Sequence, residues 1–184
     1  VWELIVPMTT VRSLHGAAAL DDKLYVLGGT HDSFRESWYS LRTVERYDPT
    51  TDIWEEMPPM MKARSQFGVA VLDGKLYAAG GLLHRSRVLG SVERFDPVTN
   101  TWEEVAPMSA PRFAHSAAVV NGKLYVAGGK QVAGPGVDSY LASVERYDPS
   151  TNTWEDVAPL QIGRSHLCLT AGCIDLASGS SSGF

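Results

Sequence analysis

The chain has 184 residues, of which 44% are hydrophobic and 20% are charged, and its formal net charge is −5. This composition is typical of one globular domain and excludes a disordered or fibrous chain. The mildly acidic balance offers no overall positive field for nucleic acid, and no apolar run approaches the ~20 residues that a membrane helix needs. We therefore expect neither nucleic acid nor a membrane as a partner.

The chain begins at Val1 within a pattern that recurs later, with no initiator Met and no signal peptide, so we expect it to be a fragment. Its two cysteines, Cys168 and Cys173, are too few for a disulfide framework or a thiolate metal site. No metal-ligand spacing or phosphate-binding loop occurs. These features predict a cytoplasmic protein without metal or cofactor.

An internal repeat organises the whole sequence. Four tryptophans recur at intervals of 52, 48 and 52 residues, at Trp2, Trp54, Trp102 and Trp154. A diglycine follows each of the first three at one offset, as Gly28-Gly29, Gly80-Gly81 and Gly128-Gly129, and a Val-Glu-Arg-aromatic-Asp-Pro segment lies ten residues before each later tryptophan. Repetition at this period predicts stacked copies of one supersecondary unit.

Each unit predicts four short strands in chain order. In the first unit, an apolar strand at residues 14–20 leads through a two-residue turn to a second strand at 23–27, which ends at the diglycine. The later copies of this turn are Asp-Gly and Asn-Gly, the dipeptides that favour a tight hairpin. A variable loop, a third strand at 43–47, an Asp-Pro turn and a fourth strand around Trp54 complete the unit.

The two glycines, the spaced aromatic residue, the tryptophan and the Pro-Met that follows make the chain resemble the kelch-repeat family. The Val-Glu-Arg-Tyr-Asp-Pro wording resembles in particular the kelch domains of BTB-kelch proteins. The resemblance implies an all-β partial propeller, with three full four-stranded antiparallel blades and flanking strands. The expected units are residues 1–8 as the last strand of a preceding blade, 9–57 as blade 1, 58–105 as blade 2, 106–157 as blade 3, 158–170 as the first strand of an incomplete blade, and 171–184 as a divergent flexible tail.

Structural roles are expected for the most regular residues of the repeat. The diglycines allow close approach of the backbone, and the tryptophans are expected to pack between blades; this group is Gly28, Gly29, Trp54, Gly80, Gly81, Trp102, Gly128, Gly129 and Trp154. His15 and His115 occupy a position where Phe67 stands in another unit, which indicates packing and not metal ligation. Glu45 and Arg46, with their copies, are expected to form a solvated or inter-blade pair. Open blade edges predict self-association of the chain.

Strand alternation places the loops before the first strand and after the second strand on one rim, where all the length variation lies. Binding residues are expected on such loops. The candidate partner-binding residues are Arg12, Ser13, Thr30, Phe34, Trp38, Tyr39, Arg64, Ser65, Leu82, Arg85, Arg112, Phe113, Lys130, Tyr140 and Arg164.

The repeated arginines leave two interpretations open. Arginine offers a planar fork of donors suited to carboxylates, so Arg12, Arg64, Arg112 and Arg164 are candidates to hold an acidic peptide. The resemblance implies the same for the arginine after Pro-Met-x-x-x and for the serine beside it. The alternative is architectural, since a residue present in every unit can pair with carbonyl groups or with a neighbouring blade.

The resemblance implies a protein-binding module that is not an enzyme. It implies the substrate-recognition part of a cullin-RING ubiquitin-ligase adaptor, which would reach the ligase through a BTB region absent from this sequence. The alternatives are an actin-associated kelch protein and a propeller enzyme that acts on a small molecule. An enzyme would need convergent acid, base or metal groups, whereas the rim candidates are basic and aromatic.

Overall fold

A computed structural model describes residues 2–31, 39–84, 87–134 and 137–166. Throughout these residues the regular structure is β-strand, and no helix is long and apolar enough to cross a membrane. The strands form three four-stranded antiparallel sheets and three two-stranded hairpins.

Each four-stranded sheet is one blade of the predicted repeat, and its strands pair in chain order. Blade 1 consists of β1 (Gly16–Leu20), β2 (Lys23–Leu27), β5 (Val44–Asp48) and β6 (Ile53–Met57). Blade 2 consists of β7 (Gly68–Leu72), β8 (Lys75–Ala79), β11 (Val92–Asp96) and β12 (Thr101–Val105). Blade 3 consists of β13 (Ser116–Val120), β14 (Lys123–Ala127), β17 (Val144–Asp148) and β18 (Thr153–Val157).

The turns between the first two strands match the sequence prediction. Asp73 and Gly74 join β7 to β8 with φ angles of 50° and 68°, and Leu72 pairs with Lys75 across them. Two successive positive φ angles are the requirement of the two-residue hairpin turn that Asp-Gly favours. Asp21 and Asp22 adopt the same conformation in blade 1 without a glycine, at φ 51° and 57°.

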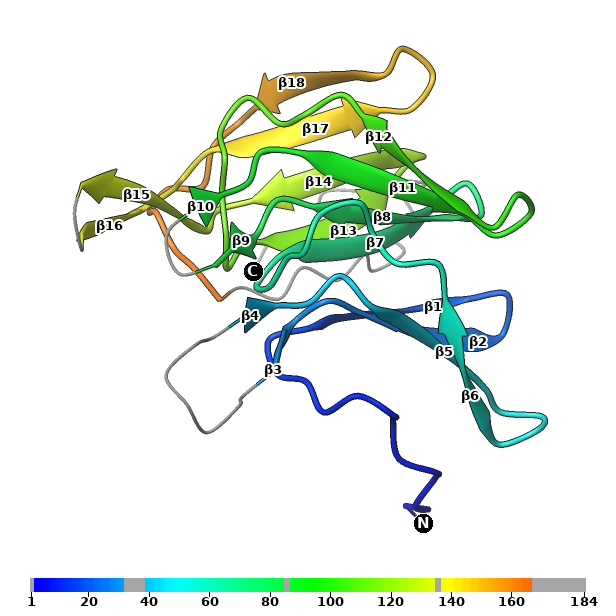
Figure 1. The fold of residues 1–184 in the computed structure, drawn as a ribbon. Helices are drawn as coiled ribbons and strands as arrows, with labels where there is room; N and C mark the ends of the chain where they lie inside the picture. Colours follow the sequence, from blue (N-terminus) through cyan, green and yellow to red (C-terminus); the bar gives the residue numbers. More distant parts are fainter. Residues whose placement is uncertain (1, 32–38, 85–86, 135–136, 167–184) are drawn as a thin grey trace, which may run out of the picture.

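The variable loop after the second strand contains β-structure that the sequence did not predict. It forms a short hairpin in each blade: β3 (Thr30–His31) with β4 (Tyr39–Ser40), β9 (Leu82–Leu83) with β10 (Arg87–Val88), and β15 (Lys130–Gly134) with β16 (Val137–Tyr140). Figure 1 shows these three hairpins on one side of the molecule and the tight turns of the blades on the opposite side.

The hydrophobic core lies between successive blades. One cluster joins Tyr25 and Leu27 of blade 1 to Leu76 and Phe95 of blade 2, and a second cluster joins blade 2 to blade 3. Alternate residues along β8 point to opposite faces, so Leu76 belongs to the first cluster and Tyr77 to the second. Blade 2 is therefore buried on both faces.

Trp102 and Trp154 pack against the clusters between blades as predicted, whereas Trp54 stacks on Tyr47 of its own blade and belongs to neither cluster. Trp102 packs against the first cluster, and its indole Nε1 donates a hydrogen bond of 2.9 Å to the carbonyl oxygen of Pro58 in the preceding crossover. At Gly80, where φ is +64°, a Cβ atom would lie 2.6 Å from the carbonyl oxygen of Arg112. No side chain fits in this space, so the backbones of blades 2 and 3 approach closely because the residue is glycine.

The N-terminal flank differs from the prediction. Residues 2–8 form no strand, although they repeat the pattern of β6 and β12. A strand needs a neighbour in its sheet, and no described strand pairs with these residues. Trp2 and Leu4 are fully exposed as a result. Residues 158–166 form no strand, like the equivalent residues 58–66 and 106–114, and the rest of the predicted first strand and tail, residues 167–184, lies outside the described residues.

Candidate functional site

One rim of the propeller is built from two segments of each blade, and we call it the loop rim. It comprises the three short hairpins and the residues that enter each first strand. Isolated β-bridges join Ser13 to Thr30, Ser65 to Leu82 and Phe113 to Lys130, which brings the two segments together in every blade. The candidate positions on these segments are therefore neighbours, as strand alternation predicted.

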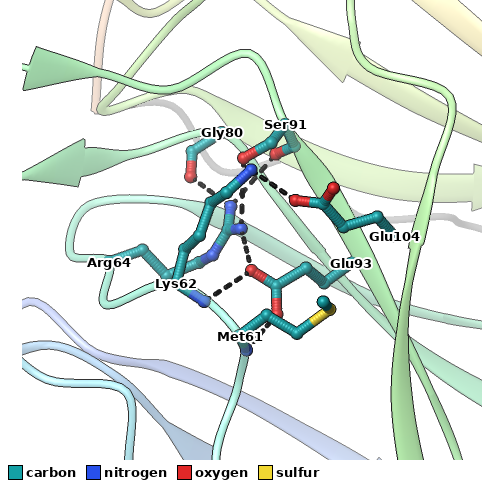
Figure 2. Close-up of polar contacts among 7 residues, drawn as sticks. All are labelled: Met61, Lys62, Arg64, Gly80, Ser91, Glu93 and Glu104. Carbon is teal, nitrogen blue, oxygen red and sulfur yellow. Dashed lines mark hydrogen bonds and ion pairs between the residues drawn. The ribbon is translucent and has the colours of Figure 1, made fainter.

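The repeated arginines lie beneath this rim with buried side chains. Arg64 Nη1 donates to the carbonyl oxygens of Gly80 at 2.7 Å and of Ser91 at 3.1 Å. Its Nη2 donates to Glu93 Oε1 at 2.5 Å and to the Ser91 hydroxyl at 3.4 Å. Figure 2 shows the guanidinium enclosed by these groups. The side chain has 0% exposure, so no surface remains for a ligand.

The same arrangement recurs in the other two blades. Arg12 donates to the carbonyl oxygens of Gly28 and Thr43 and pairs with Glu45. Arg112 donates to the carbonyl oxygens of Gly128 and Ser143 and pairs with Glu145 at 2.6 Å. Both arginine side chains have 0% exposure.

Each partner glutamate is held by the crossover that enters its own blade. Glu93 accepts hydrogen bonds from the backbone N–H groups of Met61 at 2.6 Å and Lys62 at 3.0 Å, in addition to that of Arg64. Burial alone would raise the pKa of the equivalent Glu45, but hydrogen bonds from Thr9 and Arg12 outweigh burial and lower it to about 2. The ion pair therefore fixes the crossover between blades.

These contacts correct two predictions. Direct contact of Arg12, Arg64 or Arg112 with a ligand is ruled out by their burial and their internal hydrogen bonds, so the architectural alternative holds for them. Glu45 and Arg46 do not pair with each other, because neighbouring strand residues point to opposite faces. Arg46 instead pairs with Glu55, its neighbour across the sheet.

Arg164, the fourth copy, is exposed. Its backbone follows the repeat, because the Arg164 carbonyl oxygen accepts a hydrogen bond of 2.8 Å from the Gly129 N–H. Within residues 2–31, 39–84, 87–134 and 137–166, no hydrogen bond or ion pair of its guanidinium is found. The conformation that buries the other three arginines depends on a glutamate in the blade that follows, and no such glutamate is in the described chain.

A belt of backbone hydrogen bonds runs from blade to blade at the mouth of the first strands. The N–H of Gln66 donates to the carbonyl of Leu14, that of Ala114 to Gln66, and that of His166 to Ala114, at 2.8–3.0 Å. These four residues have φ angles between 52° and 54°, a conformation unusual for residues other than glycine. Sequence reasoning missed this belt, since the side chains at the position share no chemistry.

The remaining candidates separate into buried and exposed groups. Four of these candidates are buried and support the rim from inside: Thr30, Ser65, Leu82 and Phe113. The prediction that they contact a partner is therefore wrong. Ser13, Tyr39 and Tyr140 are exposed, and Lys130 is partly exposed. Phe34, Trp38 and Arg85 lie outside the described residues.

Aromatic contacts order part of the exposed rim. Tyr39 of blade 1 and His84 of blade 2 meet edge to face, with ring centroids 6.1 Å apart. In blade 3 the Lys130 ammonium lies 5.2 Å from the centroid of the Tyr140 ring. These side chains differ from blade to blade, in contrast to the arginines beneath them.

The histidine position just before the first strand serves packing in blade 3, as predicted, whereas His15 at the same position of blade 1 is exposed. His115 is buried between blades 2 and 3, and neither ring nitrogen has a hydrogen-bond partner among the described residues. Burial and the nearby Arg112 charge lower the pKa of His115 to about 3. His115 is therefore neutral at physiological pH. In the part of the chain that the structure describes, no group of three acidic, histidine or cysteine side chains is arranged to hold a metal ion.

Three antiparallel four-stranded sheets, packed face to face with all their irregular connections on one rim, define a partial β-propeller. The model of the KLHDC2/KLHL20/DRC7 Kelch-repeats domain matches residues 6–129, and that of the Kelch motif matches residues 111–161. The chain belongs to the kelch-repeat family.

Similar proteins include several kelch-like proteins. Kelch-like protein 36 of Bos taurus is 38% identical over 82 residues, which are 44% of this chain and 13% of the relative. Kelch-like protein 33 of Homo sapiens is 45% identical over 80 residues, 44% of this chain and 14% of the relative. The influenza virus NS1A-binding protein homolog of Mus musculus is 47% identical over 75 residues, 41% of this chain and 11% of the relative. The matched part is thus a small fraction of each relative.

The solved structure of YjhT shares the fold. It superposes with a TM-score of 0.76 at 18% sequence identity, over 89% of this chain and 57% of that one. At this identity the likeness concerns the propeller architecture alone.

Proposed function

We propose that this chain is a protein-recognition module that captures its partner through the loop rim, without catalysing a reaction. The observation that carries the proposal is the contrast between the two layers of the rim. The buried layer of arginine–glutamate pairs is the same in all three blades, whereas the exposed layer differs in side chains and in hairpin length. Variable loops on a rigid scaffold are the usual position of a binding surface.

The kelch-like relatives support a protein as the ligand. One of them is named as a homolog of an influenza virus NS1A-binding protein, which indicates protein binding within the family. We extend the proposal to an adaptor role: the rim would hold a substrate for a cullin-RING ubiquitin ligase in the cytoplasm. The cullin would be reached through a BTB region, which these 184 residues do not include. Actin binding is the alternative.

Affinity capture with the full-length protein tests the proposal. The rim variant combines Tyr39→Ala with His84→Ala, which removes the exposed aromatic contact between blades 1 and 2. The control is Val98→Ser, an exposed residue in the turn at the opposite rim. We expect wild type and control to recover the same partner proteins and the rim variant to lose them, with equal melting temperatures for all three. Equal recovery by the rim variant would contradict binding at this rim.

The captured proteins then decide the adaptor role. Recovery of a cullin together with a rim-dependent substrate supports it, and loss of that substrate's ubiquitination in the rim variant is the expected consequence. Sedimentation with filamentous actin, in the absence of any cullin, would instead establish the cytoskeletal alternative.

A further inference from the structure

A groove beside the hairpin of blade 2 differs from the equivalent places in blades 1 and 3. It has a volume of about 440 Å³ and lies between the crossover from blade 1, represented by Lys62, and the β9–β10 hairpin. Residues 87–91 form most of its wall, with Leu83 on the facing strand of the hairpin. Leu83, Val88 and Leu89 make the wall partly apolar.

The internal repeat shows which groove residues are particular to blade 2. The backbone N–H of the methionine or leucine in each crossover bonds to the carbonyl of Arg42, Gly90 or Ala142, which identifies these three residues as equivalents. The same alignment places Thr10 and Ala110 at the position of Lys62, and Tyr39 and Ser139 at that of Arg87. Among the three described blades, blade 2 alone has a cation at both positions, so these two charges are not required by the scaffold.

The two cations of the groove are accessible to a ligand. Arg87 is exposed, and its side chain makes no hydrogen bond or ion pair with the described residues. Lys62 pairs with Glu104, but the two side chains are 39% and 46% exposed. Figure 2 shows Lys62 extending from the crossover toward Glu104, beside Ser91. An ion pair this exposed contributes little, so Lys62 can exchange Glu104 for another carboxylate.

We propose that this groove binds an acidic segment of a partner protein, with a carboxylate between Arg87 and Lys62 and an apolar side chain against Leu83 and Val88. Arginine binds a carboxylate with two parallel hydrogen bonds, and the lysine ammonium adds a second charge. The proposal rests on partner recognition at the loop rim and locates the acidic part of that recognition in blade 2.

Binding of defined peptides to the full 184-residue chain tests the groove. The probe is a fluorescent peptide with Asp-Glu-Leu at its centre, and its counterparts carry Asn-Gln-Leu or Asp-Glu-Ser. We expect Arg87→Ala to weaken binding of the acidic probe by about tenfold or more, and Arg87→Ala with Lys62→Ala to weaken it further. Both neutralising the acidic residues and replacing the leucine should weaken binding to the wild-type chain. Binding should fall as salt concentration rises.

The matched control is Arg42→Ala, which removes an exposed arginine of blade 1, at the position equivalent to Gly90, and changes the net charge as Arg87→Ala does. It should leave binding unchanged. An equal loss in Arg42→Ala, equal binding of the Asn-Gln-Leu peptide, or no binding of the acidic probe would each overturn the groove assignment.

Capture of partners by the full-length protein separates the two proposals. Capture that persists in the Arg87→Ala, Lys62→Ala protein and fails in the Tyr39→Ala, His84→Ala protein leaves rim recognition intact and removes the groove.

Discussion

Arg64 and Glu93 form an ion pair of 2.5 Å in which neither side chain has any exposed surface. Arg64 belongs to the crossover that leaves blade 1, and Glu93 belongs to the third strand of blade 2. Burial lowers the pKa of Arg64, and the charge of Glu93 opposes this shift. The pair thus ties the crossover to the strand that it must meet before blade 2 can pack on blade 1.

Loss of this arginine is the first prediction. Arg64→Ala leaves the buried Glu93 without its counter-ion, and we expect the free energy of unfolding to fall by about 3–5 kcal/mol. Arg164→Ala removes the exposed fourth copy and should change it by less than about 0.5 kcal/mol. Urea denaturation monitored by tryptophan fluorescence measures both. Equal effects would show that the burial of Arg64 does not determine its contribution.

Replacing both members of the pair is the second prediction. Arg64→Met with Glu93→Leu removes both charges together, so no uncompensated charge remains in the interior. We expect the double variant to be less destabilised than the sum of the single variants, by about 0.5–3 kcal/mol. It should not regain full stability, since the N–H groups of Met61 and Lys62 lose their acceptor. Additive effects in this double-mutant cycle would contradict a direct interaction.

Most of the fold could be predicted from the sequence, because the repeat marks the strands and turns of each blade. Asp73-Gly74 predicted its turn, and Gly80 predicted a close approach of backbones, which the contact with Arg112 confirms. Trp102 was correctly assigned to a blade interface. Each of these features depends on local conformation or on residue size, and both can be inferred from a short segment.

The burial of the arginines was not predictable in the same way. The position of Arg64 in the repeat is compatible with a guanidinium that points outward or inward, and the choice depends on Glu93, 29 residues later. The glutamate carried a usable signal, since it recurs in each blade together with the arginine. The arginine next to it in sequence, Arg94 in blade 2 and Arg46 in blade 1, instead suggested a local pair. The β3–β4 and β9–β10 hairpins were missed because two-residue strands are too short to show alternation.

The third prediction concerns acid stability and His115. Because its pKa is about 3 in the folded chain and 6.5 in the reference state, the unfolded chain binds this proton more strongly between those values. Stability should therefore fall as pH falls from about 6.5 toward 3, with a slope of up to about 1.4 kcal/mol per pH unit for this one proton. His115→Phe, which copies Phe67, should flatten this part of the profile.

The control for that prediction is His15→Phe at the same repeat position. His15 is exposed, so its ring is not enclosed. Partial burial and the Arg12 charge lower its pKa. Its replacement should flatten the acid profile less than His115→Phe does. Denaturant titrations at pH values from 4 to 7 provide the comparison, and an unchanged slope in His115→Phe would remove His115 as the cause. Glu45, whose pKa is lowered to about 2, adds a separate loss of stability below about pH 4.5 that both variants should retain.

The fourth prediction isolates inter-blade packing with two tryptophans. Trp54 and Trp102 stack on an aromatic neighbour of their own blade in the same way, with ring centroids 5.2 Å and 5.3 Å apart and interplanar angles of 40°. Only Trp102 also packs against a core cluster between two blades. We expect Trp102→Ala to cost about 3–5 kcal/mol of unfolding free energy and Trp54→Ala to cost clearly less.

Denaturation curves of the two variants, followed by circular dichroism, measure this difference. Each variant loses one indole, one hydrogen bond to a backbone carbonyl and one aromatic stack, so these contributions cancel in the comparison. The difference that remains is the contact of Trp102 with the cluster formed by blades 1 and 2. If Trp54→Ala were as destabilising as Trp102→Ala, the tryptophan would stabilise its own sheet and contribute nothing to the association of blades.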